Sequence, residues 1–242
     1  MNRVLTALSI ALMVMAASCS KAPAPQQPRT QKGGETPAQP AVQAKGPSLT
    51  LVQPGAGAKD LFAPDLSNCE FKAGSWEYAD GVLTRKGGGD IWTKDQYGDF
   101  VLDLEFKVDK GANSGVFIRC GDLADWINTT IEIQIHETGD GTKHGQCGAV
   151  YDIISPGKDV SKPAGEWNTM QITAKGPAIA VVMNGEKIVD INLDNWTQAG
   201  KNPQGTDNKF KYAYKDMPRS GRIGFQDHGQ PVWFRNVRIT PL

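Results

Sequence analysis

Alternation between apolar and polar residues with a period of two is the feature that most constrains this chain. In the range 100–108 every even position is apolar, whereas the odd positions include an aspartate, a glutamate and a lysine. In the range 130–136 the pattern is reversed, and three isoleucines separate four polar residues: Thr130, Glu132, Gln134 and His136. Successive side chains of a β-strand point to opposite faces, so each strand has one apolar and one polar face. The chain is therefore predicted to be all-β.

Seven further ranges are typical of short strands. Within each, apolar residues tend to recur at every second position, and turn residues flank the range. These ranges are 114–120, 148–154, 168–175, 178–183, 187–191, 222–226 and 232–240. Asn184-Gly185 lies between two of them and indicates a hairpin, because both residues tolerate the positive φ that a tight turn requires. Short strands separated by glycine- and proline-containing turns predict a β-sandwich or jelly roll.

The stretch 194–220 is polar and long for a connection inside a compact domain. Long loops often form the rim of a functional site. The alternative interpretation of this stretch is a mobile insertion.

The N-terminal part predicts export and a lipid anchor. Residues 1–18 have the form of a signal peptide, with an uncharged run too short to span a bilayer and small residues before Cys19. This resembles a bacterial lipobox, in which Cys19 is lipidated and anchors the protein to a membrane of the cell envelope. The alternative is an ordinary cleavage site followed by an incidental cysteine. Residues 19–58 are rich in Pro, Gln and Ala and are predicted to be a disordered tether, so the sandwich occupies 59–242.

Charge and cysteine content narrow the classes of partner. Lysines and arginines equal aspartates and glutamates at 26 each, and no basic cluster contains interleaved aromatic residues, so nucleic acid is not an expected partner. Apart from Cys19, the cysteines are Cys69, Cys120 and Cys147, and none has C-x-x-C spacing. A Cys120–Cys147 disulfide and buried free thiols are both compatible with this pattern.

The first candidate site lies in the segment 132–137. Period-two geometry places Glu132, Gln134 and His136 on one face, and a bulge after Ile135 would put Glu137 there instead of His136. The alternative to a functional site is that this polar face is simply the solvent-facing side of an edge strand. The polar motifs elsewhere in the sequence favour a functional face.

Two further segments and two tryptophans complete the candidate site. The segment 111–119 runs from a glycine-rich turn past Asn113 to Arg119, whose donors suit sugar oxygens or an enolate, although an ion pair with Glu132 is an equal alternative. The segment 224–229 leaves a strand and contributes three adjacent polar residues: Gln226, Asp227 and His228. A histidine at a strand end can transfer a proton near neutral pH. Trp92 and Trp126 are the expected stacking faces for a sugar.

Several segments in one order resemble the 3-keto-disaccharide hydrolase family, whose fold is related to concanavalin-A-like lectins and glucanases. They are Gly87–Thr93, Tyr97–Phe100, Leu104–Phe106, Asn113–Arg119, Glu132–Gln134, Gly148–Asp152, Pro163–Asn168 and Ile223–Gly229. The chain departs from the family at His136-Glu137, where the family more often has an apolar residue followed by aspartate. The resemblance implies a concanavalin-A-like β-sandwich (jelly roll) that binds a carbohydrate.

The resemblance also implies a chemistry. The substrate would be a 3-keto-glycoside made by a separate sugar 3-oxidoreductase, and cleavage would proceed by abstraction of the C2 proton, elimination and addition of water. A base, a proton donor and support for the enolate oxygen are needed. His228 or His136, Glu132 or Glu137, and Arg119 can supply them. A divalent metal held by Glu132 and a histidine such as His228 could polarise the ketone instead.

Two other functions remain open from the sequence. The spacing of Glu132, Gln134 and Glu137 is similar to the E-x-D-x-x-E of retaining glycoside hydrolases of the glucanase-like clan, but Gln134 replaces the central carboxylate. A non-catalytic carbohydrate-binding module is the second alternative, because a fold does not establish a function.

Overall fold

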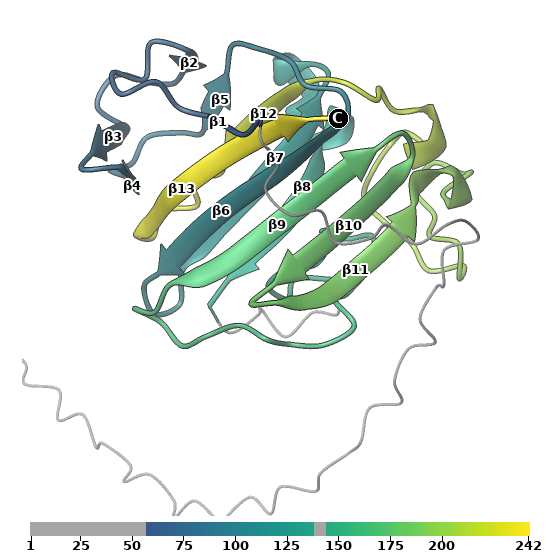
Figure 1. Cartoon of the computed structure of the whole chain (residues 1–242). Coiled ribbons are helices and arrows are strands. Elements are labelled where there is room, and N and C mark those ends of the chain that lie inside the picture. Colours follow the sequence, from purple (N-terminus) through teal and green to yellow (C-terminus); the bar gives the residue numbers. More distant parts are fainter. Residues whose placement is uncertain (1–56, 138–143) are drawn as a thin grey trace, which may run out of the picture. The chain divides into compact units, whose positions relative to one another are not determined.

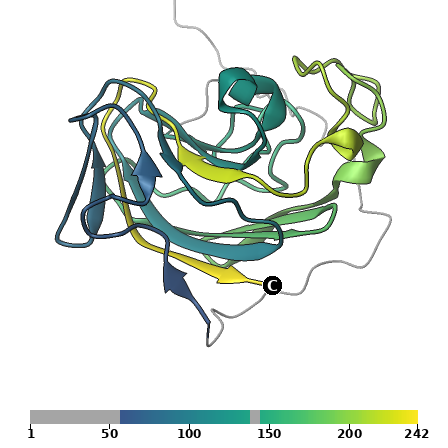
Figure 2. The same ribbon diagram turned by 90° about the horizontal axis from the view of Figure 1, so that it is seen from above.

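The computed structural model describes residues 57–137 and 144–242, which form a sandwich of two antiparallel β-sheets (Figures 1 and 2). The predicted signal peptide, Cys19 and nearly all of the predicted tether lie outside the described residues. The predicted all-β, jelly-roll class is confirmed, since helices in the described part are limited to single short turns. These are η1 (Leu123–Asp125), α1 (Trp126–Thr129), η2 (Leu193–Asn195) and η3 (Tyr214–Asp216).

The larger sheet has eight strands in the order β11-β10-β9-β6-β13-β4-β3, and β1 also pairs with β13. Its strands are β1 (Lys59–Asp60), β3 (Trp76–Ala79), β4 (Val82–Arg85), β6 (Phe100–Val108), β9 (Asn168–Lys175), β10 (Ala178–Met183), β11 (Glu186–Asn192) and β13 (Val232–Pro241). The smaller sheet has five strands in the order β2-β5-β12-β7-β8. They are β2 (Cys69–Glu70), β5 (Ile91–Thr93), β7 (Asn113–Cys120), β8 (Ile131–His136) and β12 (Arg222–Phe225).

The core lies between the two sheets and follows the predicted alternation. The even positions of β6 and the three isoleucines of β8 are all at most 3% exposed and belong to one apolar cluster. Each such side chain contributes roughly 1.5–3 kcal/mol when it leaves water. Because the isoleucines of β8 face this core, Glu132 and Gln134 must point to the opposite face of the five-stranded sheet.

Most predicted strands are present, and one is wrong. The Asn184-Gly185 turn has φ angles of 50° and 84°, as the hairpin prediction requires. The range 148–154 forms no strand, because the chain turns back on itself and Val150 makes bridges to both Ile133 and Ile154. Asp152 takes a positive φ of 61° within this turn. The segment still pairs with the edge of β8 through Val150, which explains its strand-like pattern.

All three described cysteines are buried free thiols, so the structure corresponds to the unbridged alternative. Burial raises the pKa of Cys69 and of Cys147 to about 12, so neither forms a thiolate near neutral pH. Cys147 packs against Met183 in the core, with 3.9 Å between the two sulfur atoms.

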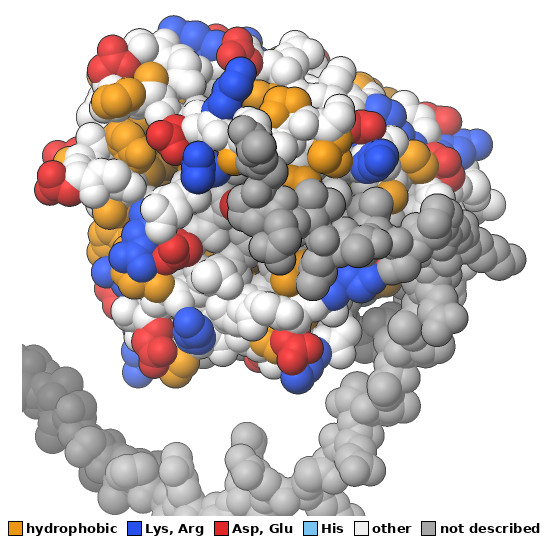
Figure 3. All heavy atoms as spheres, in the orientation of Figure 1, with side chains coloured by type: hydrophobic (Ala, Val, Ile, Leu, Met, Phe, Trp, Pro, Cys, Tyr) orange, Lys and Arg blue, Asp and Glu red, His pale blue; other side chains and the backbone are white. Residues whose placement is uncertain are grey.

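Figure 3 shows the outer face of the eight-stranded sheet, where basic and acidic side chains are interspersed. Many of these charges neutralise one another. Arg235 of β13, for example, contacts Glu105 of β6 at 2.7 Å and lies over the ring of Trp167. Among the described residues, no helix has the length and apolar character needed to cross a membrane.

The outer face of the five-stranded sheet is framed by irregular structure. Figure 2 shows α1 and the loop between η2 and η3 rising on the side of this sheet that faces away from the eight-stranded sheet. The loop is joined to η1, which directly precedes α1, by an ion pair between Lys211 and Asp125. The hollow that results contains the polar face of β8.

Candidate active site

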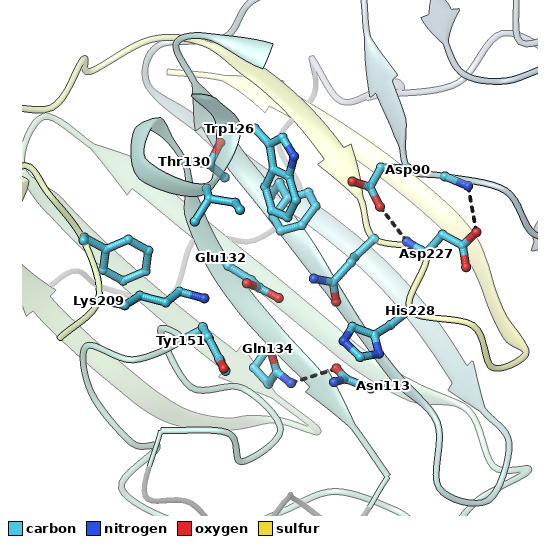
Figure 4. Close-up of a pocket in the computed structure, with 15 residues that line it drawn as sticks. Asp90, Asn113, Trp126, Thr130, Glu132, Gln134, Tyr151, Lys209, Asp227 and His228 are labelled. Atoms are coloured by element: carbon cyan, nitrogen blue, oxygen red, sulfur yellow. Dashed lines mark hydrogen bonds between the residues drawn. The ribbon is translucent and has the colours of Figure 1, made fainter. Parts of the chain in front are cut away.

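A pocket of about 470 Å³ lies on this face of the five-stranded sheet (Figure 4). Its volume is in the range of roughly 300–1,000 Å³ that is typical of small-ligand sites. The residues that line it are Gly89, Asp90, Asn113, Phe117, Trp126, Ile127, Thr130, Glu132, Gln134, Tyr151, Lys209, Phe210, Gln226, Asp227 and His228. It brings together seven of the eleven residues predicted to catalyse or to bind substrate: Asn113, Trp126, Glu132, Gln134, Gln226, Asp227 and His228.

The register of β7 and β8 determines which side chains share the pocket wall. Glu132 is paired with Phe117, and Gln134 is paired with Gly115. Since Gly115 has no side chain, the Glu132 carboxyl group lies over its backbone, and a Cβ at position 115 would be 2.5 Å from Glu132 Oε1. The amide nitrogen of Gln134 donates a 2.9 Å hydrogen bond to Asn113 Oδ1.

Gly115→Ala is therefore expected to displace the Glu132 carboxyl group. The φ of Gly115 is not in the left-handed region, so alanine tolerates the backbone, and the three atoms nearest to its Cβ all belong to the Glu132 side chain. If Glu132 takes part in catalysis, misplacement by about 1 Å can cost about 100-fold in kcat. Steady-state kinetics and a thermal unfolding curve of the variant measure the two effects. A large loss of stability with unchanged kcat would contradict the predicted displacement of Glu132.

Glu132 has the electrostatic properties of a base that operates near neutral pH. Burial in the pocket wall raises the pKa of its carboxyl group to about 7, with the Lys209 ammonium acting to lower it and Asp90 to raise it further. Within the described residues, the carboxyl oxygens of Glu132 make no hydrogen bond or ion pair. The group is thus enclosed, yet available to accept a proton from a ligand.

Lys209 and Tyr151 enter the pocket from loops. Tyr151 N donates to Glu132 O at 3.0 Å, which fixes the 148–154 turn against β8. Lys209 N donates to Asp152 Oδ2 at 2.7 Å, and Lys209 Nζ lies 4.3 Å from the centre of the Tyr151 ring. Figure 4 shows the Lys209 ammonium pointing into the pocket toward Glu132, whose carboxyl group extends to the side of His228. The long loop 194–220 thus forms part of the site's rim.

Asp227 lines the pocket, but its carboxyl group has a structural role. It forms an ion pair with Arg85 and accepts hydrogen bonds from Gly88 N at 2.6 Å and Gly89 N at 2.8 Å. Although burial opposes ionisation, the bond from Arg85 and those from glycine amides hold the pKa of Asp227 at about 2. Asp227 N in turn donates to Asp90 Oδ1 at 2.8 Å. These bonds fix the glycine-rich turn 87–89 and carry Asp90 into the pocket.

Asp90 was missed by the sequence analysis, although it ends a glycine-rich segment that the family resemblance includes. Burial raises the pKa of the Asp90 carboxyl group, and the hydrogen bond from the Asp227 N–H acts to lower it. Phe210, Thr130 and Lys209 were also not predicted as site residues. Lys209 and Phe210 lie in the polar loop 194–220, and Thr130 begins the polar alternation of 130–136. Neither feature of the sequence identifies a single residue.

An aromatic cluster forms one wall of the pocket. The ring of Phe117 stacks on Trp92 at 5.0 Å between centroids and contacts Trp126 at 4.9 Å. Trp126 and Phe117 line the pocket, whereas Trp92 lies behind Phe117 and supports it. Of the two tryptophans predicted to face a sugar, the structure places Trp126 in the pocket and Trp92 outside its lining.

The structure corrects the expectation that Arg119 shares the face of Glu132. A register shift between β12 and β7 puts one extra residue near the end of β7, and Arg119 there has a φ of 56°. A bulge reverses the direction of the side chain. The buried guanidinium of Arg119 instead contacts Asp99 at 3.0 Å and the carbonyl oxygens of Gly98 and Gly176. Arg119 therefore joins the two sheets and does not reach the pocket.

His136 and Glu137, the other predicted acid or base candidates, also lie outside the pocket lining. His136 is paired with Asn113 at the end of β8, where it is half-buried. The Glu137 carboxyl group accepts a 3.0 Å hydrogen bond from Gly111 N and so closes the turn before β7. Glu132 is thus the candidate from this segment that the geometry retains.

A metal held by Glu132 and a histidine such as His228 stays a prediction. No group of three or more His, Cys, Asp or Glu side chains among the described residues is arranged to hold an ion. The Asp227 carboxyl group already contacts Arg85 and the glycine amides, so it is not free to bind a metal together with Glu132 and His228.

Comparisons with known proteins identify relatives of this chain. A crystal structure of a provisionally named glycosyl hydrolase from Parabacteroides distasonis is 39% identical, with a TM-score of 0.74 and 76% of this chain and 99% of that chain covered. A second one from this organism, 22% identical with a TM-score of 0.63, covers 77% and 94% and shares the fold. A 3-keto-disaccharide hydrolase of Bacteroides thetaiotaomicron is 27% identical over 203 residues, or 69% of this chain and 70% of that protein.

The model of one protein family, described as the 3-keto-alpha-glucoside-1,2-lyase-like domain, matches residues 57–240. This range includes every residue of the pocket lining and both sheets except the last residue of β13. The chain therefore belongs to the 3-keto-alpha-glucoside-1,2-lyase-like family.

Proposed function

We propose that this chain cleaves the glycosidic bond of 3-keto-glycosides, such as 3-keto-disaccharides, in the pocket that contains Glu132. The proposal rests on one observation: a carboxyl group with a pKa of about 7, enclosed by amide and aromatic side chains that suit a sugar. A base is most effective when its pKa lies near the operating pH. Family membership and the name of the Bacteroides relative support the choice of substrate.

The chemistry requires a base at C2 of the sugar. A ketone at C3 makes the C2 proton acidic, because the electrons of the broken C–H bond move into the enolate oxygen. Glu132 takes this proton. Return of the electron pair re-forms the ketone, creates a double bond between C1 and C2, and expels the glycosidic oxygen, which takes up a proton. Water then adds to C1 while a proton returns to C2, so the net reaction is hydrolysis without an oxidant or a reductant.

Two other side chains suit the remaining steps. The Lys209 ammonium, opposite Glu132 in Figure 4, can stabilise negative charge on the enolate oxygen, the role that the sequence had suggested for Arg119. His228, on the other side of Glu132, can donate a proton to the departing glycosidic oxygen. Trp126 offers an apolar ring to the C–H face of the sugar.

The proposal is tested by incubating the purified protein with a 3-keto-disaccharide and with the same disaccharide in unoxidised form. We expect monosaccharide to be released from the keto form only, as measured by chromatography. Cleavage of the unoxidised form at an equal rate would indicate a retaining glycoside hydrolase instead. Binding without cleavage of either form would indicate a carbohydrate-binding module. A parallel reaction with a chelator tests whether a divalent metal takes part.

Lys209→Met is expected to lower kcat on the 3-keto-disaccharide by about 100-fold, because the charge that supports the enolate is lost. It should also move the rising limb of the kcat/KM profile, on its acidic side, to higher pH, since Lys209 lowers the pKa of Glu132. Kinetics from pH 5 to 9 measure both effects. Lys215→Met is the matched control, because Lys215 is an exposed lysine of the same loop outside the pocket lining. Equal profiles for the two variants would exclude the role of Lys209.

Two further proposals concern the context of the reaction. A 3-keto substrate has to be supplied by an oxidoreductase that oxidises C3 of the sugar, so such an enzyme is the proposed functional partner. Lipidation of Cys19 and location at the cell envelope are proposals supported by the signal sequence. Mass spectrometry of the mature N-terminus measures whether Cys19 carries acyl chains.

A further inference from the structure

Three oxygen atoms in the pocket wall are buried and have no hydrogen-bond partner within the described residues. They are Thr130 Oγ1, Gln134 Oε1 and Gln226 Oε1. Buried polar atoms without a partner are rare in native proteins, and each one calls for an explanation. A ligand that donates hydrogen bonds would satisfy these oxygens.

The acceptor on Gln134 is held in a fixed orientation. The side chain is 1% exposed, and its nitrogen donates to Asn113 Oδ1, which leaves the oxygen at the other corner of the amide. The backbone is fixed as well, because Gln134 N donates to Ala149 O at 2.9 Å and Gly148 N donates to Gln134 O at 2.7 Å. With the nitrogen bonded to Asn113, the oxygen is left as an acceptor in the pocket wall.

Gln226 is positioned on the opposite side of the same strand, β7. Its backbone N donates to Gly115 O at 2.9 Å, and its backbone O accepts from Ser114 Oγ at 2.8 Å. These bonds continue the β12–β7 pairing beyond the end of β12. The side-chain oxygens of Gln134 and Gln226 therefore flank the place where Glu132 lies over Gly115.

Amide oxygens and ketone oxygens are both acceptors only, whereas a sugar hydroxyl can donate. A ketone oxygen placed against either of these amide oxygens would leave two acceptors facing each other without a proton between them. Thr130 does not discriminate in this way, because its hydroxyl both donates and accepts. The donor that suits a ketone in this pocket is the Lys209 ammonium, which approaches from the loop side (Figure 4).

We propose that Gln134 and Gln226 are specificity-determining residues, each of which accepts a hydrogen bond from a hydroxyl group of one sugar ring. The hydroxyl groups that they contact are borne by carbons other than C3, so that the oxidised carbon faces Lys209. The part that concerns C3 rests on the proposed function, whereas recognition of hydroxyl groups by the glutamines does not.

The test uses binding rather than turnover. Dissociation constants of methyl α-glucoside and its 2-, 3-, 4- and 6-deoxy analogues are measured by ligand-observed NMR for the wild type, Gln134→Met, Gln226→Met and the control Gln96→Met, an exposed glutamine outside the pocket. In the wild type, at least one analogue other than the 3-deoxy sugar should bind about 10–100-fold more weakly, because a buried acceptor is left unpaired. Gln134→Met should weaken binding of the parent sugar and abolish the penalty for one such analogue.

Each outcome has a defined meaning. Coupling between one glutamine and one hydroxyl group, absent in Gln96→Met, supports the inference. Equal affinity of all deoxy analogues for the wild type overturns it, and so does a lack of saturable binding of the parent sugar. Rescue of the 3-deoxy analogue by Gln134→Met overturns the proposed orientation. Hydroxyl-dependent binding without cleavage of a 3-keto-disaccharide would contradict the proposed function and leave the role of the glutamines intact.

Discussion

Glu132→Gln is expected to lower kcat on a 3-keto-disaccharide by about 10²–10⁴-fold, the usual contribution of a general base. Glutamine keeps the shape of the side chain but cannot accept the C2 proton. Since Glu132 must be ionised to act, kcat/KM of the wild type should rise as the pH increases through about 7. The variant should lack this limb, while its KM changes little because the contacts to the sugar are retained. Steady-state kinetics from pH 5 to 9 measure these quantities.

Glu137→Gln is the matched control for this experiment. It makes the same change five residues further on, where the carboxyl group accepts a bond from Gly111 N outside the pocket lining. Glu137 was also the alternative acid or base in the sequence analysis. If Glu137→Gln loses activity and Glu132→Gln does not, the assignment of the base is wrong even if the substrate class is right.

The stability of Glu132→Gln provides an independent readout. The folded pKa of Glu132 is raised from 4.5 to about 7, so between these values the folded state binds more protons than the unfolded state. The free energy of unfolding of the wild type therefore falls as the pH rises through this window. At pH 8 the variant should be more stable than the wild type by about 1–3 kcal/mol. At pH 4.5 the difference should disappear, which urea unfolding can measure.

The sequence predicts the sandwich well because burial imposes a strict period on each strand. The alternation in β6 and β8 specified which side chains enter the core, and therefore that Glu132 and Gln134 face the other way. The same period failed for Arg119, because a single extra residue in β7 reverses the side chain and no turn residue marks the bulge in the sequence. The period also failed to predict the structure of 148–154. There only Val150 pairs with β8, and the chain then turns back on itself.

The candidate site was predictable only where regular strands carry it. Glu132, Gln134 and Asn113 come from β7 and β8, and Gln226 directly follows β12. Lys209 and Tyr151 come from loops whose positions depend on tertiary hydrogen bonds, such as the one from Lys209 N to Asp152. Such bonds leave no periodic pattern in the sequence. The cation of the site was therefore sought on a strand, whereas the structure places it in a loop.

Asp227→Asn is expected to lower the free energy of unfolding by about 2–4 kcal/mol at pH 7. The side chains of Asp227 and Arg85 are only 5% and 16% exposed, so the substitution leaves the arginine without its partner in a poorly solvated place. The amide bonds from Gly88 and Gly89 weaken at the same time, because a neutral oxygen replaces a charged one. Since this turn carries Asp90 into the pocket, kcat/KM should fall as well.

The pH dependence and a surface control make this prediction specific. The folded pKa of Asp227 is about 2, below the ordinary value of 3.8, so its stabilising effect is present above pH 3.8 and is lost as the pH falls toward 2. The difference between wild type and Asp227→Asn should therefore be constant from pH 5 to 7 and shrink below pH 4. Asp207→Asn removes an ion pair whose carboxylate is 79% exposed, and it should change stability by less than about 1 kcal/mol. Equal losses in the two variants, measured by urea unfolding, would mean that the Asp227 carboxyl group does not hold the glycine-rich turn against the pocket.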